Sequence, residues 1–472
     1  MNTRRTFFIL LAGIAFCVTG RSQQGQPDLD EPLKRTVIDE ISTRLRENYV
    51  FPDVAERCAE HLAARLRAGA FNSIAAPDSF AKALTDDLQS ISHDKHMRVR
   101  VRPRAPDGPS PGPPNPILEP YLQLRELAAD NYGFRKLEIL EGNVGYVDLT
   151  MFPPVELARD TAVAAMKFLS NADAIIVDER NNGGGNPSTI QLICSYFFDS
   201  RTHLNSLYWR RGDRTEEFWT LDSVEGRKMP DVPLFVLTSH RTFSGGEEFA
   251  YNLKTRKRAT IIGEVTGGGA NPGGGFPLPG GLGIFIPTGR AINPVTKTNW
   301  EGTGVEPDIK TNASDALAVA LEKARAAAKA YREAREARMR EAADQLGRRM
   351  QEAESAIKGG DALKAAALVD AILESGVEQN VLSEQAINNL GYSYLQKDQP
   401  KFAIAVFAYN VKKYPKSANV YDSLGEAYLK DGQRERAREM YRKSLELDPA
   451  NENARSTIEK IGTSRTGSDQ VK

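Results

Sequence analysis

Apolar positions recur at helical spacing over the first part of the chain, between Glu31 and Leu88. Residues three and four apart lie on one face of a helix, so three successive stripes predict a small bundle of about three helices. The chain then alternates through Arg98-Val99-Arg100-Val101, which is typical of a strand. We interpret residues 28–101 as an N-terminal helical subdomain. The stripes are Val37, Ile38, Ile41 and Leu45; Ala55, Cys58, Leu62 and Leu66; and Phe80, Leu84 and Leu88.

Residues 102–117 are expected to form a loop, because the seven prolines between Pro103 and Pro116 exclude a helix or a central strand. From residue 118 to 313, short apolar runs alternate with helical patterns, and this alternation predicts an α/β core. Strands are expected over 144–149, 174–178, 233–239, 259–263 and 282–287, with helices over 155–169 and 188–198 and from Ser244 to Arg256.

A long Ala-, Arg- and Glu-rich helix is predicted over residues 314–358, and its sparse apolar stripe is typical of a connector. Small and aromatic positions then repeat every 34 residues, which is the period of tetratricopeptide repeats. Residues 361–378 are interpreted as a further, degenerate unit. We expect an all-α repeat domain over 359–462 and a disordered tail over 463–472. The matched positions are Leu390-Gly391 with Leu424-Gly425, Ala403 with Ala437, Phe407 with Tyr441, and Pro415 with Pro449.

Residues 1–22 have the pattern of an export signal, in which Arg4 and Arg5 precede an apolar run from Phe7 to Val18. That run is short for a bilayer-spanning helix, so cleavage would leave no stable membrane span. The prediction is a periplasmic or secreted protein, with an uncleaved anchor as the alternative. The paired arginines also approximate a twin-arginine signal, which leaves both export routes open.

Charge and cysteine content narrow the picture further. The 62 Lys and Arg residues balance the 62 Asp and Glu residues, so the net charge does not indicate nucleic-acid binding. After removal of the signal only Cys58 and Cys194 remain, and the sequence fits either a disulfide between them or two buried free thiols. No metal-ligand cluster and no cofactor motif is visible in the sequence, so neither a metal nor a cofactor is expected.

Ser244 stands where an expected strand passes into an expected helix and is followed directly by two glycines. Such a position offers a nucleophile free backbone N–H groups and the positive end of a helix dipole. The simpler interpretation is structural, with Ser244 as the N-cap and Glu247 completing a capping box. The local pattern alone leaves both interpretations open.

A second glycine-rich loop, Gly183-Gly184-Gly185, follows the strand expected over 174–178. It lacks the lysine and the spacing of a nucleotide-binding loop. It is either a plain tight turn or a place where a backbone N–H is aimed at an oxyanion. The second interpretation follows because only a residue without a side chain lets a substrate approach so closely.

Taken together, five segments resemble the tail-specific (S41) serine peptidase family, in the branch without a PDZ insert that includes tricorn-core-like and retinoid-binding-protein-like domains. The resemblance covers roughly residues 33–310 and implies a crotonase-like ββα-spiral core. By position, Ser244 would be the nucleophile, and the Gly245 N–H with one glycine of 183–185, of which Gly184 is chosen, would form the oxyanion hole. The segments are Asn48 to Pro52, Asp94-Lys95-His96, Val177 to Gly185, Ser244 to Phe249, and Gly302 to Asp308.

The resemblance also implies the proton acceptor. The Ser/Lys members of the family keep their lysine 25 residues after the serine, where this chain has Gly269, so a Ser/Lys dyad is not expected. The tricorn-like branch uses a histidine and a glutamate instead, which fall on His96 and Glu301. A histidine with a pKa of about 6.5 is suited to accept the serine proton. Lys95 stands where the family often has a small or hydroxylic residue, and its charge would lower that pKa or displace the ring.

The other histidines and the two glutamates after Ser244 have weaker cases. His93 is the nearest rival of His96 as the base. The rest are interpreted as structural: His61 on a helical stripe, His203 in an expected loop, His240 facing away from Ser244, and Glu247 and Glu248 as capping and helix-surface groups.

These patterns predict an exported serine endopeptidase that cleaves peptides or unfolded polypeptides through an acyl-enzyme, with the repeats recruiting a protein partner. The alternative is a non-catalytic ligand- or protein-binding module on a peptidase scaffold. The presence of Ser244, His96 and Glu301 together favours the enzyme.

Overall fold

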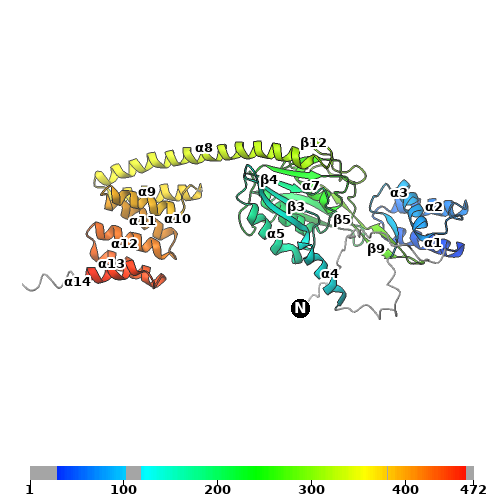
Figure 1. Ribbon diagram of the computed structural model, residues 1–472, viewed down its shortest axis with the longest axis horizontal. Coiled ribbons are helices and arrows are strands. Elements are labelled where there is room, and N and C mark those ends of the chain that lie inside the picture. The colour runs from blue at the N-terminus through cyan, green and yellow to red at the C-terminus, as the bar shows by residue number, and fades with distance from the viewer. Residues whose placement is uncertain (1–28, 103–117, 380, 464–472) are drawn as a thin grey trace, which may run out of the picture. The chain divides into compact units, whose positions relative to one another are not determined.

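The computed structural model describes residues 29–102, 118–379 and 381–463 (Figure 1). The chain forms two compact units, Met1–Arg332 and Glu333–Lys472, and each is described by itself. The expected export signal, the Pro-rich loop from residue 103 onward and the tail after residue 463 lie outside the described residues. Within the described ranges, no helix combines the length and the apolar character needed to cross a bilayer.

The predicted N-terminal bundle is confirmed as three helices, α1 (Glu31–Asn48), α2 (Pro52–Arg67) and α3 (Pro77–Ser92). Proline occupies the first helical position of α2 and α3, where its missing N–H is not needed. Asp30 caps α1 by accepting a hydrogen bond from the Leu33 N–H at 2.9 Å. The three apolar stripes pack against an antiparallel sheet of β1 (Arg98–Val101), β10 (Leu282–Pro287) and β9 (Gly273–Pro277).

The central sheet has six strands in the order β12-β8-β7-β4-β3-β2. Neighbouring strands are parallel, except that β2 pairs antiparallel with β3. Because β4 and β7 are parallel neighbours, the loops that follow their carboxyl ends meet at one edge of the sheet. The strands are β2 (Phe134–Leu140), β3 (Val144–Leu149), β4 (Ala174–Asp178), β7 (Leu234–Thr238), β8 (Thr260–Gly263) and β12 (Ile309–Lys310).

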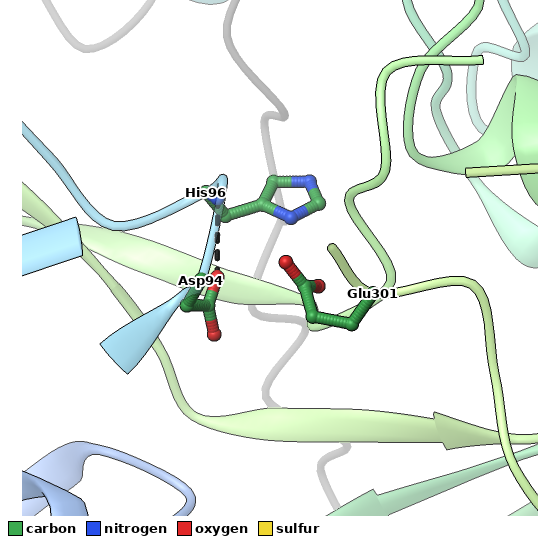
Figure 2. Close-up of side chains that lie close together, drawn as sticks. All are labelled: Asp94, His96 and Glu301. Carbon is green, nitrogen blue, oxygen red and sulfur yellow. Dashed lines mark hydrogen bonds between the residues drawn. The ribbon is translucent and has the colours of Figure 1, made fainter. Parts of the chain in front are cut away.

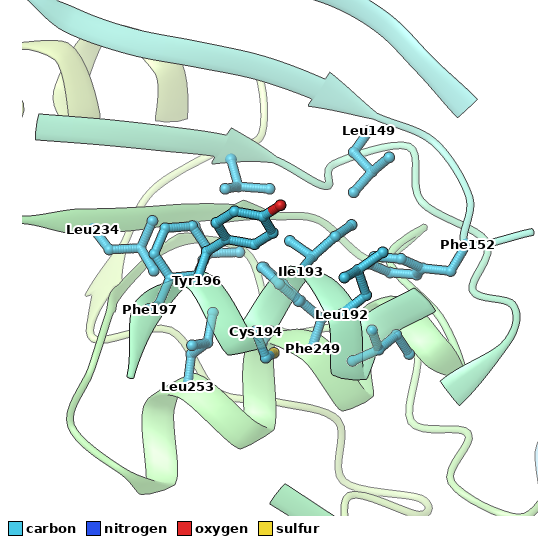
Figure 3. Packing of buried hydrophobic residues seen from close by; sticks show 14 of the residues in the cluster. Leu149, Phe152, Leu192, Ile193, Cys194, Tyr196, Phe197, Leu234, Phe249 and Leu253 are labelled. Atoms are coloured by element: carbon cyan, nitrogen blue, oxygen red, sulfur yellow. The ribbon is translucent and has the colours of Figure 1, made fainter. Parts of the chain in front are cut away.

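Helices cover one face of this sheet and fill the core shown in Figure 3. They are α5 (Val155–Leu169), α6 (Pro187–Cys194) and α7 (Gly245–Thr255), and α7 buries Phe249 and Leu253 completely. A further antiparallel sheet adds to the same core, in the order β11 (Gly289–Ile292), β5 (His203–Trp209) and β6 (Arg214–Trp219). The predicted α/β class is therefore confirmed.

The long helix α8 (Ala316–Lys358) is more than the connector expected from its sparse apolar stripe. Its first part packs alanines, each four residues from the next, against the opposite face of the central sheet. Small side chains on one helical row let the helix lie close to that sheet. Its last part gives Leu346, Met350 and Ala353 to the core of the second unit. The buried alanines are Ala316, Ala320, Ala324 and Ala328.

The second unit consists of paired helices that repeat as the 34-residue period predicted. Gly391 faces the ring of Phe407 and Gly425 faces the ring of Tyr441, so any side chain at either glycine would press on the partner helix. The predicted role of these small residues in close packing is therefore confirmed. The helices are α9 (Ala362–Glu378), α10 (Glu384–Gln396), α11 (Pro400–Lys413), α12 (Ala418–Lys430), α13 (Arg434–Leu447) and α14 (Glu452–Thr463).

Some local expectations were wrong or incomplete. The helix expected over 188–198 is α-helical only to Cys194, and a 3-10 turn follows. His203 lies in β5 rather than in a loop, and its ring stacks on Trp219 with centroids 4.4 Å apart. Cys58 and Cys194 are both buried and free, and they lie in different core clusters, which decides the open question against a disulfide. The helix α4 (Leu118–Ala129) and the strands β2, β5, β6, β9 and β11 were not expected.

The alanine stripe of α8 gives a direct test of its core role. Replacing Ala324 with Leu inserts three carbon atoms between helix and sheet, and overpacking of this kind costs about 1–3 kcal/mol of unfolding free energy. Ala326→Leu, on the exposed side of the same turn, is the control and should change stability little. Urea unfolding followed by tryptophan fluorescence measures this, because Trp209, Trp219 and Trp300 all belong to the first unit. Equal stability of the two variants would contradict the packing described.

Candidate active site

Ser244 occupies a sharp turn between the end of β7 and the start of α7. Its backbone has φ 53° and ψ −117°, a left-handed conformation that a residue with a side chain rarely adopts. Strain of this kind costs on the order of 1–3 kcal/mol and persists only where the surroundings enforce it. The turn sets Ser244, which is partly exposed, ahead of the positive end of α7.

The side chain of Glu247 holds this turn in place. Its carboxylate accepts hydrogen bonds from the backbone N–H of Ser244 at 2.8 Å, of Gly268 at 2.6 Å and of Gly269 at 2.8 Å, and from the Thr266 hydroxyl at 2.5 Å. The bond to Ser244 is the backbone half of the predicted capping box. Glu247 is fully buried, so it acts as the capping group that was expected and is not exposed on the helix surface. Burial raises its pKa to about 7, although all four hydrogen bonds act in the opposite direction.

The glycine loop after β4 packs directly against the Ser244 turn. A Cβ atom on Gly184 would lie 2.6 Å from the Gly245 nitrogen and 2.8 Å from the Ser244 Cβ. A Cβ atom on Gly245 would lie 2.7 Å from the Gly185 nitrogen. Since real Cβ atoms do not approach so closely, these glycines are required by contact as well as by their positive φ values at 184 and 185.

The backbone donors of this region differ in their availability. Gly245 is the first residue of α7, so its N–H has no acceptor within the helix. The Gly184 N–H donates to Asn182 Oδ1 at 2.8 Å, and the predicted role of Gly184 in an oxyanion hole requires that bond to break. Within the described ranges the Gly185 N–H donates to no other group. Gly185, an alternative within the expected 183–185 loop, is therefore a rival of Gly184 as the donor.

His96 follows α3 and lies between two aromatic rings. Its imidazole centroid is 4.6 Å from that of Phe243 and 5.8 Å from that of Phe285. Burial, with a smaller effect of the Arg98 charge, lowers the pKa of His96 to about 3, so the ring is neutral at physiological pH. The expectation of a pKa near 6.5 is thus corrected, and the nearby charge is that of Arg98 rather than Lys95.

Gly269 brings the His96 ring and the serine turn together. A Cβ atom on Gly269 would lie 2.7 Å from His96 Cε1 and closer still to the ring of Phe243, the residue before Ser244. No side chain fits at this position while the His96 and Phe243 rings stay where they are. A lysine such as the Ser/Lys peptidases carry here is therefore sterically excluded. Among the described residues, no hydrogen bond joins His96 to Ser244 or to Glu301.

Glu301 and Asp94 lie beside the imidazole (Figure 2). One oxygen of Glu301 accepts the Lys95 N–H at 2.9 Å, and the other accepts the N–H groups of Ala270 at 2.6 Å and Asn271 at 3.1 Å. The Glu301 carboxylate points toward the imidazole edge that carries Nδ1. Nδ1 is buried and has no hydrogen-bond partner among the described residues.

The sequence did not single out Asp94 as a member of the site. Its carboxylate accepts the His96 N–H at 3.1 Å, the Tyr49 hydroxyl at 3.2 Å and the Asn271 side-chain amide at 2.9 Å. Burial, and then repulsion from Glu301, raise the pKa of Asp94 to about 7, and burial also raises the pKa of Glu301. The sequence signal for Asp94 was its place in the Asp94-Lys95-His96 segment, which resembles the family but gave Asp94 no role of its own.

The other titratable candidates lie elsewhere. His93 is exposed and ends α3 in a left-handed conformation, and its N–H donates to the Gln89 carbonyl at 2.9 Å. His240 is exposed and pairs with Glu264 at 2.9 Å. His61 pairs with Asp87 at 3.2 Å, in keeping with a structural role. Glu248 is buried rather than on the helix surface, and burial raises its pKa to about 7.

Comparison with known proteins assigns three parts of the chain. The model for peptidase family S41 matches residues 143–311, and a model described as the N-terminal domain of Peptidase_S41 in eukaryotic IRBP matches residues 33–131. A tetratricopeptide-repeat model matches residues 418–451. The first two matches together cover most of the first unit, and the third lies in the second unit.

Curated relatives are similar over part of their length. The chloroplastic carboxyl-terminal-processing peptidase 1 of Arabidopsis thaliana is 28% identical over 182 residues, 38% of this chain and 36% of that protein. The tricorn protease of Thermoplasma volcanium is 30% identical over 152 residues, 32% of this chain and 13% of that protein. The chain thus spans well under half the length of these relatives. A solved photosystem II D1 C-terminal processing protease aligns with a TM-score of 0.38 at 17% identity, over 60% of this chain and 93% of that chain.

The Glu247 contacts predict a stability effect that does not depend on any activity. Glu247→Gln replaces one acceptor oxygen by an amide donor that faces backbone N–H groups, and unsatisfied buried donors cost about 1–3 kcal/mol. Glu306→Gln, which removes only an exposed ion pair with Lys310, is the control and should cost well under 1 kcal/mol. Urea unfolding followed by tryptophan fluorescence compares the two. A Glu247→Gln protein as stable as the control would mean that these hydrogen bonds do not hold the turn.

Proposed function

We propose that this chain, which carries a peptidase family S41 domain, an S41 N-terminal domain and a tetratricopeptide repeat, is a serine endopeptidase that cleaves peptides or unfolded polypeptides. The observation that carries the proposal is the strained Ser244 turn, which one loop, residues 266–271, links to both His96 and Glu301. A turn that only held a helix end would not need this conformation or these two partners.

The neutral state of His96 suits it to act as the base. In the tautomer with its proton on Nδ1, the imidazole faces Glu301 with that proton and keeps the Nε2 lone pair free. Nε2 would take the Ser244 proton as Oγ attacks the scissile carbonyl carbon, and it would return that proton to the leaving amine as the C–N bond breaks. Glu301 would stabilise the imidazolium that forms in between. Water would then attack the acyl-enzyme. Nε2 would take a proton from the water and give it to Ser244 Oγ as the acyl–oxygen bond breaks.

The developing oxyanion requires backbone N–H donors, for which two sources are proposed. The Gly245 N–H is one of them, because it opens α7 beside Ser244. The second donor comes from the glycine loop. Gly184 would serve if its N–H left Asn182, whereas Gly185 has no such bond to break among the described residues. Each such donor contributes a factor of about 10²–10³ in turnover in serine peptidases.

Export and partner recruitment complete the proposal. The charged and apolar pattern of residues 1–22 supports export to the periplasm or the medium. Paired helices with the tetratricopeptide period present a concave surface that commonly holds an extended or helical segment of another protein. The repeats are therefore proposed to recruit a protein partner or a substrate chain to the peptidase unit.

Mutation of the nucleophile tests the proposal through kinetics. Ser244→Ala should reduce cleavage of an unfolded polypeptide such as casein by about 10³-fold or more, since no other group takes the acyl chain. Its unfolding free energy should stay within about 1–2 kcal/mol of the parent, the range of a lost helix cap. Ser239→Ala, at a buried serine that donates to the Arg180 carbonyl, is a matched control that should retain turnover if it folds. Normal cleavage by Ser244→Ala would refute the assignment.

The carboxyl pair predicts a pH effect with a definite sign. Because His96 is neutral down to about pH 3, the acidic limb of kcat/KM should report ionisation of Glu301, whose pKa burial raises. Asp94→Asn leaves one titrating carboxyl in place of two, so any part of the limb that comes from Asp94, whose pKa burial and Glu301 raise to about 7, should be lost and the limb should move to lower pH. Asp86→Asn, an exposed residue on α3, should leave the limb in place. A limb at pH 6–7 that persists in Asp94→Asn would instead indicate titration of an ordinary histidine.

A further inference from the structure

We propose that Asp94, His96 and Glu301 bind a transition-metal ion of the Zn²⁺ class and that this binding holds the peptidase inactive. The inhibitory half of the proposal rests on the proposed function, whereas the binding half does not. The three residues converge only in the folded chain, so the sequence pattern did not indicate a metal here. The matched family description names no metal either.

The three side chains come from two separate loops and converge on one point (Figure 2). Asp94 and His96 follow α3, and Glu301 lies between β11 and β12. One ligand atom from each side chain lies within 4.8 Å of the other two. Ligands about 2.0–2.2 Å from a tetrahedral zinc ion lie about 3.3–3.6 Å apart, so closure requires side-chain movements on the order of 1 Å.

Each of the three groups keeps a donor position open toward the others. His96 Nδ1 is buried without a partner, and it faces the Glu301 carboxylate. The Asp94 oxygen nearer to His96 accepts only the His96 N–H, and one Glu301 oxygen accepts only the Lys95 N–H. A carboxylate oxygen has two lone pairs, so each of these oxygens retains one for a metal.

The surroundings supply the supports that metal sites require. The Tyr49 hydroxyl and the Asn271 side-chain amide donate to the second Asp94 oxygen. The backbone N–H groups of Ala270 and Asn271 donate to the second Glu301 oxygen, so both carboxylates are held in place. Two buried carboxylates at this separation repel each other, and a divalent cation would remove that repulsion. One imidazole and two carboxylates are also a donor set that zinc and related ions accept.

Occupancy would block the proposed chemistry at a defined atom. A metal binds the lone pair of Nδ1, so the proton of the neutral imidazole moves to Nε2, which then has no lone pair left to accept the Ser244 proton. The same ion would bind the Glu301 carboxylate, which is proposed to stabilise the imidazolium. Removal of the ion restores both groups, so the inhibition should be reversible.

Binding is measured on the full-length, metal-free protein by titrating Zn²⁺ in competition with a chromophoric zinc indicator. The parent should bind one equivalent, and Ser244→Ala should bind it equally well, because the serine is not a ligand. Asp94→Asn should weaken that equivalent at least about tenfold, and Glu301→Gln provides a second ligand variant should Asp94→Asn fail to fold. His240→Gln is the control, since it removes an exposed histidine–carboxylate pair outside the site.

The outcomes separate this inference from the proposed function. One-equivalent binding that Asp94→Asn weakens and His240→Gln leaves unchanged supports the site, whether or not casein is cleaved. Equal binding by the parent and both ligand variants, weakening by His240→Gln alone, or no stoichiometric binding would overturn it. If the parent cleaves casein, saturating zinc should abolish cleavage and EDTA should restore it. Full turnover by the zinc-loaded protein would refute the inhibitory role while leaving the peptidase assignment intact.

Discussion

The buried carboxylate of Glu247 is the constraint on which the site depends. It joins the N–H of Ser244, at the start of α7, to the N–H groups of Gly268 and Gly269 on a separate loop. The unfavourable backbone conformation of Ser244 can persist because these bonds would be lost if it relaxed. The same loop carries the backbone donors that hold Glu301, so one carboxylate fixes the turn and indirectly sets the position of the other.

Close packing around this loop excludes a lysine as the proposed base. Gly269 has room for no side chain, since the rings of Phe243 and His96 occupy the space a Cβ atom would take. A lysine at this position would displace the imidazole, and an imidazole in its present place excludes the lysine. The histidine follows the N-terminal bundle, whose helices α1–α3 share an apolar core with the sheet of β1, β10 and β9. The bundle thereby delivers His96 and Asp94 to the edge of the α/β core.

Much of the fold could be predicted from the sequence because its signals are local. The three helical stripes, the apolar strands β4 and β7 and the 34-residue period each lie within one segment of the chain. Strands β6 and β9 were missed because β6 is charged and β9 is mostly glycine, so neither shows the alternation of a half-buried strand. The buried row of α8 consists of alanines, which carry too little apolar surface to stand out in a sequence.

The candidate site shows where local reasoning ends. Ser244 could be identified from the strand, the two glycines and the helix around it. Its unfavourable φ of 53° could not be predicted from that pattern. The role of Glu247 depends on partners 19 to 22 residues away, and that of Asp94 on Asn271, 177 residues away. The pKa of His96 is lowered by burial, and the rings beside it are Phe243, in the turn before α7, and Phe285, on β10. Burial and long-range hydrogen bonds thus set the chemistry, and neither can be read from a single segment.

The central claim is that Ser244 is an activated nucleophile, and a fluorophosphonate probe tests it most directly because phosphonylation requires activation of the serine hydroxyl in the folded site. After labelling, mass spectrometry of the digested protein should find one adduct, on the peptide that contains Ser244. Labelling should be lost on urea unfolding and should slow strongly in His96→Gln. An unlabelled Ser244 in folded protein, or labelling at the same rate in His96→Gln, would contradict the account.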